Sequence, residues 1–447
     1  MNKLFKRLST IRLLAIGFAL LILLGALLLM LPVCSRDGRS IPFENALFTA
    51  TSATCVTGLV VYDTWTQFAL PGQIILLILI QLGGLGFMML TLVSAMLLHR
   101  RIGLKERLVL VEAFSSPRLR GVIRLGQRIL LGTILVECSG AVLLGLRFVP
   151  QFGWARGIWY SIFHSVSAFC NAGFDLMGQF EPYGSLTPFA NDWLVCCTVM
   201  GLILTGGIGF TVLDDLIEHG LHAKRYRLHS KVMLLATLIL TAGGALAFFL
   251  SEKDASMQAM APDERLLASL FQAVTTRTAG FNTIDQARLS PFGKALTLLL
   301  MFVGAGAGST GGGMKVSTCV VLALSVVAYV RGQDEINLFD RRMDKSVERR
   351  ALNGALLYAG VLLIGHMLLL AIQSSLPFFD SLYECVSAIG TVGMSTGITR
   401  ALSPAARLVV ILMMYAGRVG SLSIVMAFTE RKNTANTRRP VGKLIVG

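Results

Sequence analysis

The sequence predicts an all-α integral membrane protein in which four parallel membrane–pore-loop–membrane repeats surround a central pore. Hydrophobic residues make up 54% of the 447 positions and the mean hydropathy is +0.69. Charged residues, at 15%, are too few for a soluble globule of this size. One short motif that ends in glycine occurs four times, and eight long apolar runs flank its copies in pairs.

The repeated motif begins with an aromatic residue and ends with a glycine nine or ten residues later. Its copies span 48–58, 163–173, 271–280 and 383–393, the third being one residue shorter than the others. The terminal glycines are 115, 107 and 113 residues apart. A nearly constant period over the whole chain indicates one structural unit used four times.

Each copy of the motif is too short to cross a membrane. Eight to ten residues make a short helix, whereas the hydrocarbon core is roughly 30 Å thick. The terminal glycine lets the chain leave the helix through backbone angles that other residues avoid. Irregular backbone at that depth is tolerated only where it lines a water-filled cavity or is buried in protein. We therefore expect four re-entrant pore helices.

The apolar runs predict eight transmembrane helices, because each run is long enough to cross. They cover about 10–31, 72–98, 122–149, 192–217, 228–250, 292–330, 351–376 and 404–429. Two spans per unit give all four motif copies the same orientation, as in parallel repeats around an axis along the membrane normal. The repeats are 1–98, 99–217, 218–330 with a broken gating helix, and 331–447 with a C-terminal tail.

The distribution of basic residues predicts the orientation of the chain. The connections on one side of the membrane hold 26 of the 40 Lys and Arg residues, and they are 1–12, 99–124, 218–231, 331–350 and 430–447. By the positive-inside rule both termini are cytoplasmic and the protein is a multi-pass protein of the cytoplasmic membrane. The net charge of +15 then reflects topology and contacts with membrane lipid or an acidic partner, and not nucleic acid.

The outer connection 174–192 contains three acidic residues, Asp175, Glu181 and Asp192, and no Lys or Arg. It either concentrates cations at the mouth of the pore or is an ordinary solvated loop.

The residues that end each motif are candidates for an ion selectivity filter. Four pore helices would point the negative ends of their dipoles at a common centre, and a dehydrated monovalent cation needs a ring of oxygens in place of water. The candidate filter residues, which would bind potassium through their carbonyls, are Val56, Thr57, Gly58, Asn171, Ala172, Gly173, Thr278, Ala279, Gly280, Thr391, Val392 and Gly393. The alternative is that these glycines only allow close helix packing. Their fourfold repetition favours the filter.

The second apolar run of the third unit contains ten residues, 304–313, made only of Gly, Ala, Ser and Thr. Each interior glycine costs a helix roughly 1 kcal/mol relative to alanine, so we expect a break and a loop beneath the filter. The candidate gate residues are Gly304, Gly306, Gly308, Ser309, Thr310, Gly311, Gly312, Gly313, Lys315 and Arg418. The second runs of the other units are also glycine-rich, but less so.

Arg418 lies within the last apolar run, where an unpaired charge costs at least a few kcal/mol. It either lies in the pore below the filter, repelling cations or donating to the 304–313 carbonyls, or pairs with an acid such as Glu137. Lys315 either holds the broken segment or extends toward the cytoplasm. Arg277 either braces the third loop or pairs with an outer acid.

No signature of an enzyme or a bound cofactor is present. The chain lacks HExxH and Cys-x-x-Cys patterns, so an intramembrane enzyme or lipid-handling protein is the weaker hypothesis. Gly306, Gly308 and Gly311 match a dinucleotide fingerprint formally, but no strand precedes them. His164 is expected to be a hydrogen-bonded pore-helix residue and not a metal ligand. No cofactor is therefore expected in this chain, and potassium enters only as the ion that the filter candidates would bind.

These four units, their glycine-ended loops and the break in the third unit resemble the Trk/Ktr/HKT superfamily of potassium transporters from about residue 10 to the end. The length favours the KtrB branch of membrane subunits over the TrkH branch, which usually carries an extra N-terminal helix pair. The resemblance implies that the filter glycines are Gly58, Gly173, Gly280 and Gly393. It also implies that 304–313 is the gating loop and Arg418 the pore arginine.

The resemblance further implies a homodimer with one pore per subunit and a cytosolic KtrA-like regulatory ring that binds nucleotide and opens the gate. The basic connection 331–350 is a plausible contact for that ring, and the apolar tail 444–446 either docks at a dimer interface or is disordered. The expected function is potassium uptake down its electrochemical gradient. The alternative is a sodium- or proton-coupled symporter on the same scaffold, with Glu137 as its titratable candidate.

Overall fold

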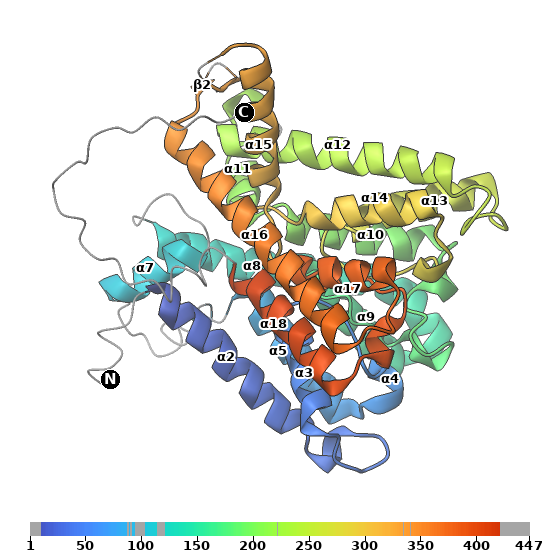
Figure 1. Cartoon of the computed structure of the whole chain (residues 1–447). Coiled ribbons are helices and arrows are strands. Elements are labelled where there is room, and N and C mark those ends of the chain that lie inside the picture. Colours follow the sequence, from blue (N-terminus) through green and yellow to red (C-terminus); the bar gives the residue numbers. More distant parts are fainter. Residues whose placement is uncertain are drawn as a thin grey trace.

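The computed structural model describes residues 10–86, 89, 92–93, 103–113, 121–220, 222–333, 335–339 and 341–420. The regular secondary structure of this part of the chain is helical apart from one antiparallel pair of two-residue strands, β1 (Asn337–Leu338) and β2 (Arg341–Arg342). The predicted helical class is therefore confirmed (Figure 1). The tail 444–446, the connection 430–447, most of 1–12 and part of 99–124 lie outside the described residues.

Each of the four units contains a long first helix, a short middle helix and a second helix that is interrupted or ends early. Unit one has α2 (Thr10–Leu29), α3 (Phe43–Thr54) and α5 (Leu70–Leu85), and unit two has α8 (Val122–Phe152), α9 (Trp154–Phe169), α10 (Trp193–Gly207) and α11 (Phe210–His219). Unit three has α12 (Leu228–Ser251), α13 (Pro262–Thr275), α14 (Pro291–Phe302) and α15 (Val316–Val330). Unit four has α16 (Lys345–Ile372), α17 (Phe378–Gly390) and α18 (Pro404–Val419). The smaller helices α4 (Thr64–Gln67) and α7 (Leu104–Ala113) belong to the connections.

Side-chain caps and prolines fix where the second helices begin. Ser290 and Ser403 accept backbone N–H groups of the first turns of α14 and α18, and proline occupies the first position of each helix. Asp192 caps α10 in the same way.

Four helices of the described residues are long and apolar enough to cross a membrane, namely α2 from Arg12, α8, α12 and α16. The pair α10 and α11 would make a fifth span, bent by 100°. The sequence predicts eight spans with a break in the sixth alone, and the difference lies in the second helices of the other units. Gly86, Gly209 and Gly420 have φ values of 82°, 110° and 90° and follow the ends of α5, α10 and α18. Helical backbone cannot continue through that conformation.

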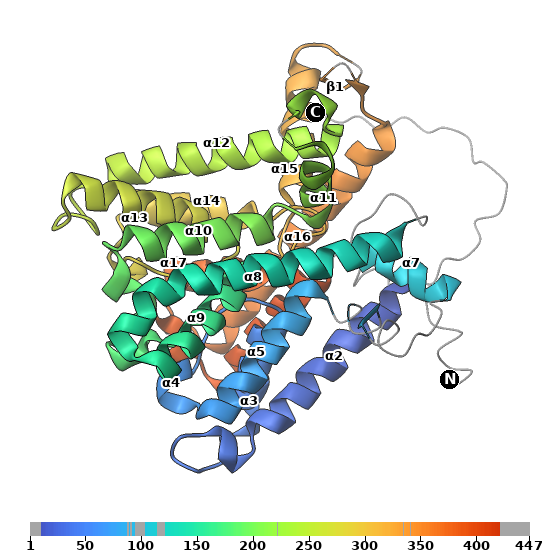
Figure 2. The ribbon, with the colours of Figure 1, turned by 180° about the vertical axis from the view of Figure 1, so that it is seen from behind.

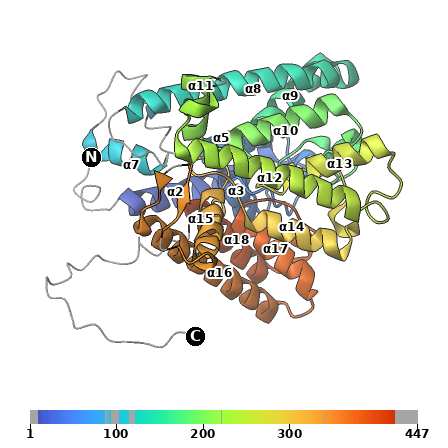
Figure 3. The same cartoon turned by 90° about the horizontal axis from the view of Figure 1, so that it is seen from above.

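The four units contact one another in a closed cycle. The second helix of each unit packs against the short middle helix of the next, through the pairs α5–α9, α10–α13, α14–α17 and α18–α3. Units two and four consequently lie on opposite sides of the molecule, as α8 and α9 against α16 and α17 show in Figure 3. Figure 2 shows α8, α9 and α5 side by side on the rear face, where units one and two meet.

Glycines bring each second helix close to the middle helix of its own unit. A Cβ on Gly83, Gly206 or Gly417 would lie 2.1, 1.8 or 2.1 Å from the carbonyl oxygens of Thr54, Phe169 and Ile389, respectively. No side chain fits at these three equivalent positions, because real Cβ atoms do not approach backbone so closely. Close approach of this kind is how small residues pack membrane helices.

This packing predicts that Gly206→Ala destabilises the protein, since the added methyl group must displace the last turn of α9. Overpacking typically costs about 1–3 kcal/mol. The matched control is Gly201→Ala in the same helix, where an added Cβ meets nothing within 4 Å. Thermal unfolding in detergent should show a lower midpoint for Gly206→Ala alone, and equal midpoints for both variants would contradict the packing argument.

Candidate functional site

The candidate filter residues adopt one unusual backbone conformation in all four units. The residue two positions before each terminal glycine has a left-handed φ, 57° at Val56, 58° at Asn171, 67° at Thr278 and 50° at Thr391. This conformation is strained for β-branched residues, and three of the four are β-branched. The terminal glycines also have positive φ, which glycine adopts freely.

The four terminal glycines form a closed ring with carbonyls of the neighbouring units. A Cβ on each glycine would lie within 2.1–2.7 Å of the carbonyl oxygen that precedes the next glycine of the ring. The pairs are Gly58 with Ala172, Gly173 with Ala279, Gly280 with Val392, and Gly393 with Thr57. The structure thus brings together candidate filter residues that are more than 100 positions apart in the sequence.

A hydroxyl four residues after each motif aromatic braces the loop. Ser52 and Ser387 accept the N–H groups of Gly58 and Gly393, each at 3.1 Å. The equivalent hydroxyls of Ser167 and Thr275 donate to the carbonyls of Phe174 and Phe281, at 2.7 and 2.6 Å. Sequence reasoning missed these side chains, although their fixed spacing from the aromatic residue was a visible signal.

Backbone bonds orient the residue before each glycine. The N–H groups of Thr57, Ala172, Ala279 and Val392 donate to carbonyls of the braced middle helix at 2.8–3.0 Å. The N–H side of each peptide therefore faces its own helix.

A cavity of about 640 Å³ lies on one side of the ring and is lined by all four terminal glycines. Its wall carries more acidic than basic side chains, namely Asp63, Asp175, Glu181 and Asp285 against Arg288 and Arg400. Burial, and then the charge of Asp63, raises the pKa of Asp175 to about 7. Of the acids in 174–192, Asp175 and Glu181 thus face the cavity, whereas Asp192 caps α10 and pairs with Arg147.

The loop of residues 303–315, between α14 and α15, lies against the glycine ring from another direction. The hydroxyl of Thr310 donates to the carbonyl of Phe169 at 3.1 Å, and the N–H of Gly312 donates to the hydroxyl of Thr391 at 2.9 Å. A Cβ on Gly311 would lie 2.2 Å from the hydroxyl oxygen of Thr278. The 303–315 loop therefore contacts the filter candidates of units three and four and the last residue of α9.

Backbone bonds attach the 303–315 loop to the interrupted second helices. Gly306 N donates to Gly207 O at 2.8 Å, and Phe210 N donates to Gly308 O at 2.8 Å. On the opposite side, Gly313 N donates to Gly417 O at 3.3 Å. Ser309 bonds within the loop, its hydroxyl donating to Gly306 O at 2.8 Å. Gly304 lies at the base, where a Cβ would be 2.7 Å from Met314 O.

Two basic side chains hold carbonyls of the loop. Arg418 donates to the carbonyls of Thr310 and Gly83, and also to that of Gly84 at 2.9 Å. Lys315 donates to Gly311 O at 2.9 Å and Gly312 O at 3.2 Å. Arg418 therefore bridges the loop to the end of α5. Its alternative partner Glu137 instead accepts a hydrogen bond from Gln81 at 3.1 Å.

The remaining charged and titratable candidates have structural contacts. Arg277 is 5% exposed and donates to Thr237 of α12 at 3.3 Å, behind the third glycine loop. His164 contacts the carbonyl of Tyr160 at 2.7 Å and accepts the N–H of Leu176 at 3.2 Å. It thus links its helix to the chain that follows the second glycine loop.

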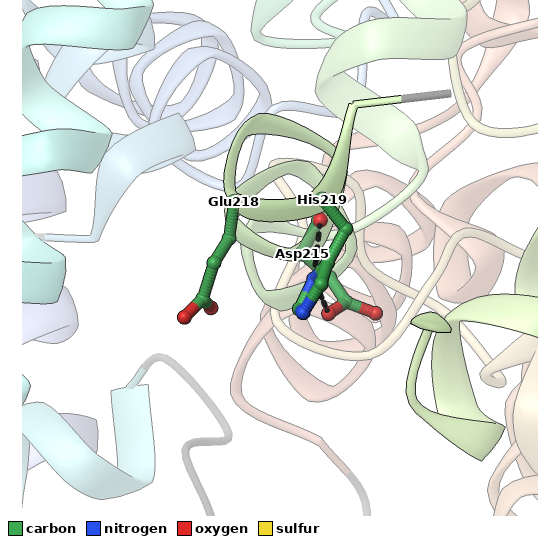
Figure 4. Close-up of side chains that lie close together, drawn as sticks. All are labelled: Asp215, Glu218 and His219. Atoms are coloured by element: carbon green, nitrogen blue, oxygen red, sulfur yellow. Dashed lines mark hydrogen bonds and ion pairs between the residues drawn. The ribbon is translucent and has the colours of Figure 1, made fainter. Parts of the chain in front are cut away.

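A cluster away from the ring has the residue types of a metal site. Ligand atoms of Asp215, Glu218 and His219, all on α11, lie within 4.8 Å of one another (Figure 4). Asp215 accepts the N–H of Arg227 at 2.8 Å and contacts His219 at 3.1 Å, and Glu218 pairs with the Arg227 guanidinium at 3.2 Å. These contacts account for the cluster as the attachment of α11 to the start of α12.

Comparison with known proteins finds relatives of this chain among cation transporters. The family model "TrkH: Cation transport protein" matches residues 18–437. The chain is 41% identical to Ktr system potassium uptake protein B of Bacillus subtilis over 97% of this chain and 96% of that protein. It is 38% identical to the potassium/sodium uptake protein NtpJ of Enterococcus hirae, over 99% and 98% of the two chains. The crystal structure of the potassium transporter TrkH from Vibrio parahaemolyticus aligns with a TM-score of 0.77 at 19% identity, over 96% of this chain and 87% of that one.

Proposed function

The chain belongs to the TrkH family of cation transport proteins, and we propose that it takes up potassium through a channel-like filter gated by the 303–315 loop. The observation that supports this most directly is the closed ring of four glycines and four carbonyls. As a multi-pass membrane protein of this family, the chain needs a path for a cation, and the ring is the point where all four units meet.

The ring suits a dehydrated monovalent cation. The carbonyls of Thr57, Ala172, Ala279 and Val392 replace the water around the ion, and the C-terminal ends of the four middle helices add negative dipole potential. The glycine–carbonyl ring itself contains no carboxylate, so the ion is held weakly enough to leave. The cavity of about 640 Å³ beside the ring, called the vestibule from here on, carries more acidic than basic side chains. It therefore raises the local cation concentration before the ion enters the ring.

The 303–315 loop is the gate in this proposal. It contacts the filter candidates, and Arg418 adds a positive charge next to the loop, which opposes a passing cation. Opening requires the loop to release the carbonyl of Phe169 and the hydroxyl of Thr391. The neutral hydrogen bonds that attach the loop to the neighbouring segments are each worth about 0.5–1.5 kcal/mol net, and several of them must break together, along with the bond from Arg418, for the loop to move.

The proposal extends to the orientation of the chain and to its partners. The vestibule faces outward and both termini are cytoplasmic, as the basic connections indicate. We propose a homodimer that carries a KtrA-like nucleotide-binding ring on its cytoplasmic face. The contact is the β1–β2 hairpin with its exposed Arg341 and Arg342, which projects beyond α15 and α16 (Figure 1). Because α15 directly follows the gate loop, a pull on the hairpin reaches the loop through one helix.

Gly280→Ser is expected to reduce potassium over sodium selectivity, because a side chain at this position would meet the carbonyl of Val392 at 2.4 Å. The matched control is Gly38→Ser, a glycine with φ of 67° and open space around its Cβ position. The measurement is ⁸⁶Rb⁺ uptake into liposomes in competition with sodium or potassium. Unchanged potassium over sodium selectivity in Gly280→Ser would show that the ion does not pass through this ring.

Arg418→Gln is expected to raise potassium flux, since it removes the charge and the bridge from the Thr310 carbonyl to α5. Deleting 306–312 should also raise flux, because it removes most of the loop that blocks the path, although Arg418 remains. Liposome flux at fixed membrane potential measures both, with Arg407→Gln on the same helix as control. Flux that falls or stays unchanged in both gate variants would show that the loop does not close the pore.

The second candidate is a sodium- or proton-coupled symporter. The name of the Enterococcus hirae relative, a potassium/sodium uptake protein, favours it, and Glu137 is buried in the membrane-spanning α8. Glu137 packs against Gln81 of α5, at the boundary of units one and two, and does not line the vestibule.

Removing the sodium and proton gradients separates the two candidates. At a fixed membrane potential, the channel-like mechanism should retain full potassium flux in liposomes, because no second ion has to move. Loss of flux under these conditions, restored by adding one gradient, would establish the coupled symporter instead.

A further inference from the structure

A second cavity, of about 220 Å³, lies outside the ring of glycines between α8, α10 and α11. Its lining is mostly apolar and includes Leu125, Ile129, Val136, Phe169, Phe210 and Leu213. Ile217 at its edge is 72% exposed, and Leu131 and Leu135 on α8 are 67% and 71% exposed. The cavity therefore opens on an apolar surface of the kind a bilayer covers, and its lining suits hydrocarbon better than water.

The mouth of this cavity is charged. The Arg128 guanidinium contacts Asp214 at 2.9 Å and is half exposed. Arg124, which is also exposed, precedes it by one helical turn and lies on the same face of α8. A guanidinium at this position can donate to a phosphate oxygen while Asp214 remains beside it.

A buried hydroxyl adds a polar contact inside the cavity. Thr133 is 2% exposed, and its Oγ1 has no hydrogen-bond partner within the described residues. It follows Arg128 by five positions, which is about 7.5 Å deeper along the helix. A phospholipid has its groups in the same order: an acyl chain for the apolar lining, an ester oxygen for the Thr133 hydroxyl and a phosphate for the Arg128 guanidinium.

We propose that this cavity binds one phospholipid of the cytoplasmic leaflet. The phosphate lies against Arg128, an ester carbonyl accepts the Thr133 hydroxyl, and the acyl chain fills the apolar space down to Phe169. Full binding needs both the charges of Arg128 and Arg124 and the apolar wall. A free phosphate would contact only the arginines, and a detergent tail would contact only the apolar wall.

The bound lipid contacts the attachments of the gate. Phe169 and Phe210 line the cavity, and their backbone groups bond Thr310 and Gly308 at 3.1 and 2.8 Å. Hydrocarbon packed behind these two residues holds the 303–315 loop in the position seen here. This effect on gating and the choice of leaflet rest on the proposed function, whereas the binding of the lipid does not.

Native mass spectrometry of the full-length protein, titrated with dioleoylphosphatidylglycerol, tests binding. Arg128→Gln should weaken retention roughly fivefold, the usual worth of one basic side chain at a phospholipid surface. Arg147→Gln is the matched control. Arg147 lies at the other end of α8, away from the cavity, and pairs with Asp192. Equal retention by the two variants would overturn the headgroup assignment.

A second variant tests whether an acyl chain fills the cavity. Gly132 lines the cavity and an added Cβ there meets nothing within 4 Å, so Gly132→Phe fills the cavity while Gly132→Ala leaves most of it open. Gly360→Phe on α16 controls for a new aromatic at an equally open glycine. Loss of the lipid in Gly132→Phe alone supports the proposal. Full retention of the lipid in Gly132→Phe overturns it.

Potassium flux in liposomes tests the link to the gate. Flux should rise in Arg128→Gln relative to Arg147→Gln, because the anchors of the loop lose the hydrocarbon behind them. Weaker lipid retention with unchanged flux would overturn the link while leaving the site. Absence of potassium flux in the unmodified protein would instead defeat the proposed function, and the binding result would still stand on its own.

Discussion

The structure depends on the mutual contact of four glycine-ended loops. Each terminal glycine abuts a carbonyl of the next unit, and no Cβ fits in any of the four contacts. The residue two positions earlier is held in a left-handed conformation, which costs of order 1–3 kcal/mol outside glycine. The cyclic packing of second helices against middle helices provides the constraint that keeps this strained ring closed.

Breaking four helices within a membrane protein leaves backbone groups that must be satisfied by protein. The breaks satisfy one another, since the 303–315 loop exchanges hydrogen bonds with the ends of α10, α11 and α18. Arg418 and Lys315 complete this network by donating to carbonyls. The same bonds that make the irregular backbone tolerable therefore hold the proposed gate beneath the proposed filter, and lipid packed behind Phe210 would reinforce them.

Much of this arrangement could be predicted from the sequence because it repeats. The period of the motif identified the four glycines that meet in the ring, and the composition of 304–313 predicted a loop where α14 ends. The breaks at Gly86, Gly209 and Gly420 could not be predicted, because two or three glycines in an apolar run are compatible with a continuous helix. The hydrogen-bond partners of Arg418 could not be predicted either, since they are backbone carbonyls, which every residue type has.

Locating the bound ion would test the account most directly. The structure should be determined in rubidium or thallium, whose anomalous scattering distinguishes them from water. The account predicts a peak on the axis between the carbonyls of Thr57, Ala172, Ala279 and Val392. An axis without a peak, with the cation bound instead by carboxylates such as Asp63 and Asp175, would contradict it.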